Sequence, residues 1–273
     1  MDNTSMIRRH PVILFYLLAF LFSWLGWGPQ ALYERGFLPF SPPMLGLLGG
    51  AGPTLAAVVV ILLLREKDGI RKLFSPLFRL RASLWWYLFV FLFWFMVTGI
   101  ALGVGTLFGR PFPAIGGFAW WNLMPVFVTM LLSNVWEEIG WRGFALPRLQ
   151  ERYTDGAIVG IMGLLWSLWH LPLMLTPSSP MSGLPGYGEV LFSLSLTVIY
   201  TWLYRNTGRS LFFVSVFHAM SNTVAFALVE LGVFATSYLF VVGVTAVVAI
   251  AIVLVYGPRR FARPSLEATG ASG

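Results

Sequence analysis

Ionisable and amide side chains stand within three long apolar stretches of this sequence, at spacings that could bring them together. They are Glu137, Glu138 and Arg142 in the first stretch, His170 in the second, and His218 and Asn222 in the third. Carboxylates and imidazoles are the groups that deprotonate water, and imidazoles and amides can donate hydrogen bonds to a developing oxyanion. The set has the components needed to hydrolyse a peptide bond.

Composition limits where such chemistry could take place. The chain has 273 residues, of which 58% are hydrophobic and 11% charged, whereas about 25% of the residues in a soluble domain are charged. The absence of cysteine excludes disulfides, thiolate metal sites and cysteine nucleophiles. The net charge of +7 comes from residues in short loops and not from one solvent-exposed surface, so we expect no nucleic-acid partner.

Eight apolar segments are long enough, or nearly so, to cross a bilayer, which takes about 20 helical residues. They cover residues 11–28, 43–64, 84–108, 119–146, 156–175, 188–204, 210–231 and 234–256. We therefore predict an all-α, polytopic membrane protein with about eight transmembrane helices, forming a single integral membrane domain over residues 1–273. The start of the chain has no small-residue cleavage pattern, so the first span is expected to be retained. Residues 257–273 are expected to form a flexible cytoplasmic tail.

The basic residues indicate the orientation of the spans, because Lys and Arg accumulate in cytoplasmic loops. With the amino terminus inside, 15 of the 18 Lys and Arg lie in inner segments and only Arg35 and Arg110 in outer loops. The sequence thus predicts a multi-pass protein of the cell membrane with both termini cytoplasmic. The segment Arg65–Arg81 mixes apolar and basic residues and could be either an amphipathic helix on the inner surface or a solvated loop.

Glycines at four-residue spacing indicate where helices approach one another closely. Three such pairs lie in predicted spans: Gly46 with Gly50, Gly99 with Gly103, and Gly156 with Gly160. We interpret all three as packing features without a functional role.

Helical geometry relates the polar residues to one another. Glu138 and Arg142 are four residues apart and can pair, while Glu137 points about 100° away from Glu138. Trp166 and His170 share a face just before Pro172, which weakens the helical ladder, and His218 and Asn222 are also one turn apart. At 1.5 Å per residue, Glu137, His170 and His218 can reach a common depth.

Each of these residues also has a structural interpretation. Arg142 could extend to the inner interface with Glu138 as its partner, and an isolated His or Asn can simply join helices. Glu189 and Glu230, at outer ends of spans, are expected to be solvated. Three helices that each carry polar groups at compatible depths favour a functional site.

The pattern Glu137-Glu138-x-x-x-Arg142, a histidine four residues after an aromatic, and His218-x-x-x-Asn222 resembles the CAAX protease and bacteriocin-processing (CPBP, or Abi) family of intramembrane peptidases. The matching block covers about Trp136 to Asn222, within a motif core of about residues 119–231. The family usually has phenylalanine where this chain has Trp166. The resemblance implies a CAAX type II prenyl endopeptidase-like fold, and a substrate that is a membrane-associated peptide or protein, such as a prenylated tail or a bacteriocin-like peptide.

The resemblance also implies roles for these residues. Glu137 and His170 would hold and activate water, and His218 and Asn222 would face the oxyanion. Glu138 and Arg142 would form a supporting pair. A water-filled pocket that opens to the cytoplasm would reconcile these groups with the lipid bilayer.

Other interpretations remain open at this stage. Two histidines and a carboxylate could bind zinc, although the His-Glu-x-x-His signature is absent; we favour a site without a cofactor, with zinc as the alternative. A transporter could use the same groups as a proton or solute path, but it would predict inverted repeats, which we do not see. A scaffold without activity is disfavoured because every presumed catalytic position is filled.

Overall fold

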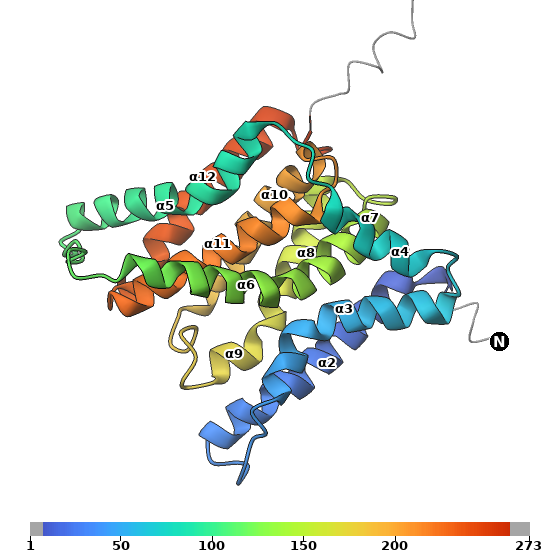
Figure 1. Cartoon of the computed structure of the whole chain (residues 1–273), viewed down its shortest axis with the longest axis horizontal. Coiled ribbons are helices and arrows are strands. Elements are labelled where there is room, and N and C mark those ends of the chain that lie inside the picture. The colour runs from blue at the N-terminus through green and yellow to red at the C-terminus, as the bar shows by residue number, and fades with distance from the viewer. Residues whose placement is uncertain (1–7, 263–273) are drawn as a thin grey trace, which may run out of the picture.

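The computed structural model describes residues 8–262, and the regular secondary structure of this part of the chain is all helical, without strands. Figure 1 shows the helices packed side by side as one bundle. The elements are α2 (Pro11–Glu34), α3 (Leu45–Leu64), α4 (Gly69–Phe74), η1 (Ser75–Phe78), α5 (Leu84–Leu107), η2 (Trp120–Asn122), α6 (Leu123–Glu138), η3 (Ile139–Ala145), α7 (Leu146–Leu149), α8 (Asp155–Trp169), α9 (Leu171–Leu175), α10 (Gly186–Asn206), α11 (Leu211–Glu230) and α12 (Phe234–Tyr256).

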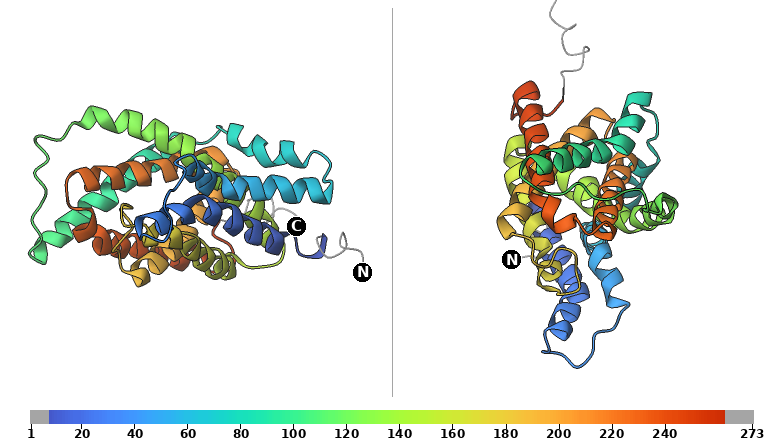
Figure 2. Two further views of the ribbon diagram at one scale, coloured as in Figure 1. Left: turned by 90° about the horizontal axis from the view of Figure 1, so that it is seen from below. Right: turned by 90° about the vertical axis from the view of Figure 1, so that its left-hand side faces the viewer.

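The predicted all-helical membrane architecture is confirmed, with helix bounds close to those expected. Six helical segments are long and apolar enough to cross a membrane: α2, α3, α5, α8 with α9, α11 and α12. Two more stretches complete the bundle. One is the continuous run α6–η3–α7, and the other is α10, which is rich in serine and threonine. Both pack within the bundle, α6 against α3 and α11, and α10 against α8 and α12. The two views of Figure 2 show the elongated bundle that results.

The two ends of the described chain lie at the same end of the bundle, together with the basic connections. Arg8 and Arg152 line one cavity there. At the other terminus, the backbone carbonyl of Pro258 accepts a hydrogen bond from Gly156 N at 2.8 Å. This arrangement matches an even number of passes, which the charge distribution also predicted.

The segment after α12 is not a free tail up to residue 262. Phe261 is completely buried, and its backbone N–H donates to the Asp155 carboxylate at 2.8 Å. The same carboxylate, itself buried, accepts from Arg205 on α10 at 2.7 Å. We call Asp155, Arg205 and Phe261 the terminal clip. The prediction of a flexible tail is therefore wrong for residues 257–262, because an aromatic side chain and a buried carboxylate fix them, while residues 263–273 lie outside the described part.

The close contacts between helices occur mostly at other glycines than those predicted. A Cβ added at Gly99, Gly103 or Gly160 would meet nothing within 4 Å. Tight packing instead involves Gly26 of α2 against Gly49 of α3, where an added Cβ would collide with the neighbouring backbone. Spacing alone does not show whether a small-residue face meets a helix or lipid, so the interpretation of the pair Gly99 and Gly103 was wrong.

Gly140 supports the part of the chain that carries the glutamates. A Cβ at this position would collide with Pro53 of α3. We expect Gly140→Ala to lower the free energy of unfolding by about 1–3 kcal/mol through overpacking. The matched control Gly99→Ala should be neutral or slightly stabilising, because alanine is favoured over glycine in open helical positions. Thermal unfolding in detergent compares the two, and equal melting temperatures would contradict the packing argument.

Short helices form in the segment Arg65–Arg81, which the sequence left as either amphipathic or loop. Leu73 of α4 and Pro76 of η1 are buried against the bundle, while Arg71 and Lys72 are exposed. The segment therefore covers one end of the bundle with an apolar underside and a basic outer face.

Candidate functional site

A cavity of about 230 Å³ collects polar residues from separate helices. Four of the six predicted site residues line it, and so does an acid that the sequence analysis placed elsewhere: Glu137, His170, His218, Asn222 and Glu189. The remaining two, Glu138 and Arg142, are buried behind His218. All six predicted residues therefore belong to one neighbourhood, although they come from α6, η3, the α8–α9 junction and α11.

The junction of α6 and η3 presents the two glutamates differently. At Ile139 the α-helix widens into a π-helix that extends to Ala145, a local distortion that often occurs at functional sites. Glu137 lines the cavity and is 8% exposed, and its Oε2 has no hydrogen-bond partner among the described residues. Glu138 is fully buried. One carboxylate thus has a buried oxygen without a protein partner, and its neighbour is engaged by protein groups.

Glu138 joins two helices through one oxygen. Its Oε1 accepts from Arg142 Nη1 at 2.9 Å and lies 2.9 Å from Nδ1 of His218. An ionised carboxylate can only accept, so Nδ1 of His218 carries the proton in this contact. The other ring nitrogen, Nε2, is then the atom available on the cavity side.

Arg142 does not extend to the interface as one interpretation of the sequence suggested. It is 2% exposed, and its guanidinium carbon lies 4.4 Å from the ring centre of Trp166 and 4.1 Å from that of Tyr200. Stacking between two aromatic faces stabilises a cation in a desolvated position. The residue that departs from the family's usual phenylalanine, Trp166, thereby gives Arg142 a larger aromatic surface.

His170 stands where the fifth pass is interrupted. It ends α8 and precedes α9, whose second residue is Pro172. Proline is compatible with the first turn of a helix but cannot continue the preceding ladder. The break turns the histidine ring towards the cavity, where its Nδ1 lies 3.2 Å from Oε1 of Glu189.

Glu189 is the residue that the sequence analysis missed. It was expected to be solvated but is only 3% exposed. Ser193 donates to its Oε1 at 2.8 Å and Tyr238 donates to its Oε2 at 3.3 Å. The available signal was Ser193 one turn later, since a hydroxyl at that spacing can satisfy a carboxylate within the same helix.

His218 and Asn222 lie one turn apart on α11 and both line the cavity. His218 is 6% exposed and packs edge-on against the rings of Trp166 and Tyr200, with centroid distances of 5.8 Å in both cases. These contacts and the bond to Glu138 fix the imidazole plane. Asn222 is less buried and is free to offer its amide to a ligand.

The cavity extends away from the basic end of the bundle, the end that the charge distribution of the sequence predicts to be cytoplasmic. Its lining includes Leu184, before α10, and Phe234, at the start of α12, and both connections lie opposite the basic loops. Towards the basic end, the space is filled by the buried side chains of Trp141, Arg142 and Tyr16. The ion pair and the aromatic residues around it form this closed side.

The donor atoms around the cavity also suit zinc, which binds imidazole and carboxylate groups. Each imidazole has a carboxylate near its Nδ1, as metal-bound histidines commonly do. No three His, Asp or Glu side chains within residues 8–262 converge closely enough to hold an ion as they stand.

Comparison with known proteins identifies one matching family and one similar protein, both described as CAAX prenyl proteases or endopeptidases. Residues 118–224 match the family described as Type II CAAX prenyl endopeptidase Rce1-like, a range that includes all six predicted site residues. The chain is also 26% identical over 226 residues to CAAX prenyl protease 2 of Methanococcus maripaludis, an alignment that covers 77% of this chain and 82% of the relative.

Proposed function

Because the chain belongs to the CAAX protease and bacteriocin-processing family of intramembrane endopeptidases, we propose that the cavity around Glu137 is its hydrolytic centre. The substrate is a peptide or protein held at the membrane, and a prenylated protein tail is the first candidate, since the relative is named for such substrates. The observation that carries the proposal is the meeting of Glu137, His170, His218 and Asn222 in one buried cavity.

Glu137 is the general base in this proposal. A water molecule held between its carboxylate and Nε2 of His170 attacks the carbonyl carbon of the scissile bond. The water proton passes to Glu137, and the oxyanion forms on the carbonyl oxygen. When the C–N bond breaks, that proton goes to the leaving amine. The free Oε2 of Glu137 supports this role, because no protein donor competes for it within residues 8–262.

His218 and Asn222 stabilise the oxyanion. Donation by Nε2 of His218 requires a second proton on the ring, because Nδ1 already carries the one shared with Glu138. Glu138 Oε1, 2.9 Å from Nδ1 of His218, would be the counter-charge of that ring, and Arg142 fixes the carboxylate. The proposed hydrolysis involves no metal.

The direct test is cleavage of a farnesylated tail peptide by the purified protein in liposomes, followed by mass spectrometry. Wild type should release the residues after the modified cysteine, whereas His170→Ala should not. Adding substrate to one side of oriented vesicles shows which end of the bundle admits it. Activity lost to a chelator and restored by stoichiometric zinc would replace the metal-free mechanism, and cleavage of a bacteriocin-like peptide in place of the prenylated one would reassign the substrate.

Glu189 acts as a positioning residue in this mechanism. Nδ1 of His170 lies 3.2 Å from Oε1 of Glu189, although the pair does not have hydrogen-bond geometry. A carboxylate at this distance favours the tautomer with the proton on Nδ1, which leaves Nε2 of His170 as the acceptor that water needs. We expect Glu189→Gln to lower kcat by about 10- to 100-fold, as for other groups that orient a ligating histidine. The pH profile of kcat should shift as well, which a purely structural role would not cause.

Glu189→Asp and Glu230→Gln are the controls for this prediction. Aspartate keeps the charge and should recover part of the rate. Glu230 is exposed, away from the cavity, so its variant should cleave like wild type. A Glu189→Gln protein with unchanged kcat and pH profile would contradict the positioning role.

A further inference from the structure

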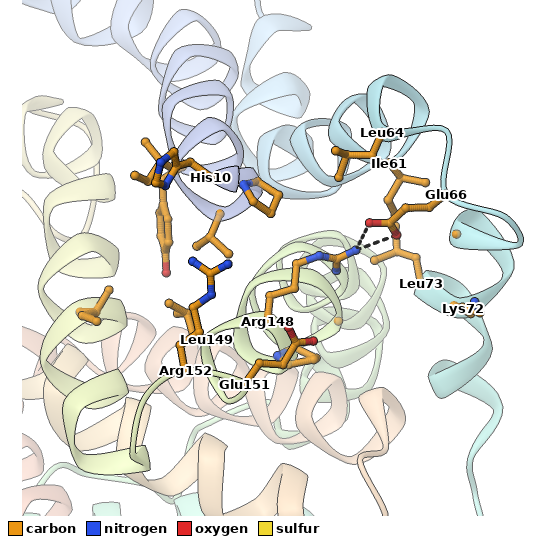
Figure 3. A pocket seen from close by; sticks show the side chains of 18 of the residues that line it. His10, Ile61, Leu64, Glu66, Lys72, Leu73, Arg148, Leu149, Glu151 and Arg152 are labelled. Atoms are coloured by element: carbon orange, nitrogen blue, oxygen red, sulfur yellow. Dashed lines mark hydrogen bonds and ion pairs between the residues drawn. The ribbon is translucent and has the colours of Figure 1, made fainter. Parts of the chain in front are cut away.

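A second, larger cavity lies at the basic end of the bundle and has no part in the proposed hydrolysis. Its volume is about 1130 Å³, and it is bounded by the start of α2, the end of α3, α4, α7 and α8. Figure 3 shows its interior, with Arg148 and Arg152 extending from neighbouring positions of the chain and Arg148 bound to Glu66. We propose that this cavity binds the headgroup and one acyl chain of an anionic phospholipid.

The charge of the rim points to an anionic ligand. Seven lining residues are Lys or Arg and two are glutamates, a surplus of five positive charges. The cations are Arg8, Arg9, Lys72, Arg79, Arg148, Arg152 and Arg209. Glu66 is already engaged by Arg148, through two contacts of 2.7 Å. No ion pair joins Arg152 or Arg209 to a carboxylate within residues 8–262.

The walls below this rim point to a lipid and not to a free anion. Leu17 and Phe20 of α2 and Ile161 and Leu165 of α8 line the same cavity. From Pro11 to Phe20, nine residues at 1.5 Å each, the apolar wall descends about 14 Å along α2. Leu17 is 65% exposed, so the cavity is continuous with the lipid-facing surface of that helix.

This order of groups matches the structure of a phospholipid. Phosphate is recognised by arginine side chains at the interface, and an acyl chain fills an apolar groove between helices. Basic pockets between transmembrane helices on the cytoplasmic side are known to bind anionic headgroups, and each Lys or Arg near the surface contributes about 1 kcal/mol. Figure 3 shows four other apolar residues of the lining, Ile61, Leu64, Leu73 and Leu149, together with the charged groups.

The test measures lipid binding to the purified full chain in detergent, by the shift of its melting temperature with added dioleoyl phosphatidylglycerol. Dioleoyl phosphatidylcholine and inorganic phosphate are the comparison ligands. Phosphatidylglycerol should stabilise wild type with saturation, and the other two should not. The double variant Arg152→Gln with Arg209→Gln should bind phosphatidylglycerol about 25-fold more weakly, given the contribution of each charge.

The matched control removes two charges at the same end but outside the cavity, Arg71→Gln with Arg81→Gln. It should bind the lipid like wild type. If the first double variant does not fold, Arg152→Gln alone provides the same comparison. If both double variants lose affinity for phosphatidylglycerol equally, the lipid is attracted by the general surface charge, and the proposed site is overturned. If inorganic phosphate raises the melting temperature as much as the lipid does, the cavity is a phosphate site. If a peptide with a free α-carboxylate displaces the lipid, the cavity binds the tail of the substrate. None of these readouts depends on peptidase activity.

Discussion

Glu137→Gln should retain the fold and lose about 10³-fold or more in the rate of cleavage. Removal of a general base forfeits a contribution of about 10² to 10⁴, and in the proposed mechanism this carboxylate also holds the attacking water. Glutamine has nearly the same shape, and Glu137 Oε2 has no protein partner that would be lost within residues 8–262. The melting temperature should therefore stay close to that of wild type. Single-turnover cleavage of a farnesylated peptide in liposomes measures the rate.

Glu230→Gln is again the control, since it removes a carboxylate of the same type from an exposed position. A folded Glu137→Gln protein that cleaves within tenfold of wild type would show that another group activates water. His170→Ala then becomes the informative variant, because His170 is the imidazole in the cavity lining that has no bond to Glu138.

Glu138→Ala should destabilise the protein by about 3–5 kcal/mol, the usual cost of leaving one charge of a buried pair without its partner. Arg142 would remain 2% exposed between Trp166 and Tyr200 without a counter-charge, and His218 would lose its bond. A loss of this size is a large part of the 5–15 kcal/mol of free energy that typically separates folded from unfolded states. Thermal unfolding and the monodisperse fraction on size-exclusion chromatography would measure the loss.

The paired variant Glu138→Leu with Arg142→Met separates charge from packing. Replacing both partners of a buried pair with apolar groups is often neutral for stability, so the double variant should melt well above Glu138→Ala. It should still be inactive, because His218 loses the contact with Glu138 that fixes its ring. If Glu138→Ala is as stable as the double variant, Arg142 has found water or another partner in place of Glu138.

Most of the fold could be predicted from the sequence, because a membrane span is specified by a local property. A run of about 20 apolar residues has few alternatives to a helix in lipid, and the predicted segment 84–108 became α5, Leu84–Leu107. The meeting of the six polar residues could be anticipated for a related reason. Spacings of four residues place side chains on one helical face, and their depths follow from the helical rise.

The features that sequence could not provide depend on which faces of the helices meet. Glu189 lies near the end of its span and would be solvated if that end were open, but Tyr238 of α12 covers it. Gly99 and Gly103 have the spacing of a packing motif but face no neighbouring helix closely. The direction of the cavity around Glu137 depends likewise on Trp141 and Tyr16 filling one side, which follows from three-dimensional packing and has no local signature.

The terminal clip has a consequence for biosynthesis. Asp155 begins α8, Arg205 lies near the end of α10, and Phe261 follows α12. During synthesis, the backbone N–H of Phe261 can therefore bind the Asp155 carboxylate only after more than a hundred further residues have been translated. During that interval, α8 and α10 can already associate through their packing and through the bond between Arg205 and Asp155. This end of the bundle can therefore reach its final arrangement only after every pass has been inserted, and a ribosome stalled before Phe261 would leave a loosely closed intermediate for membrane quality control.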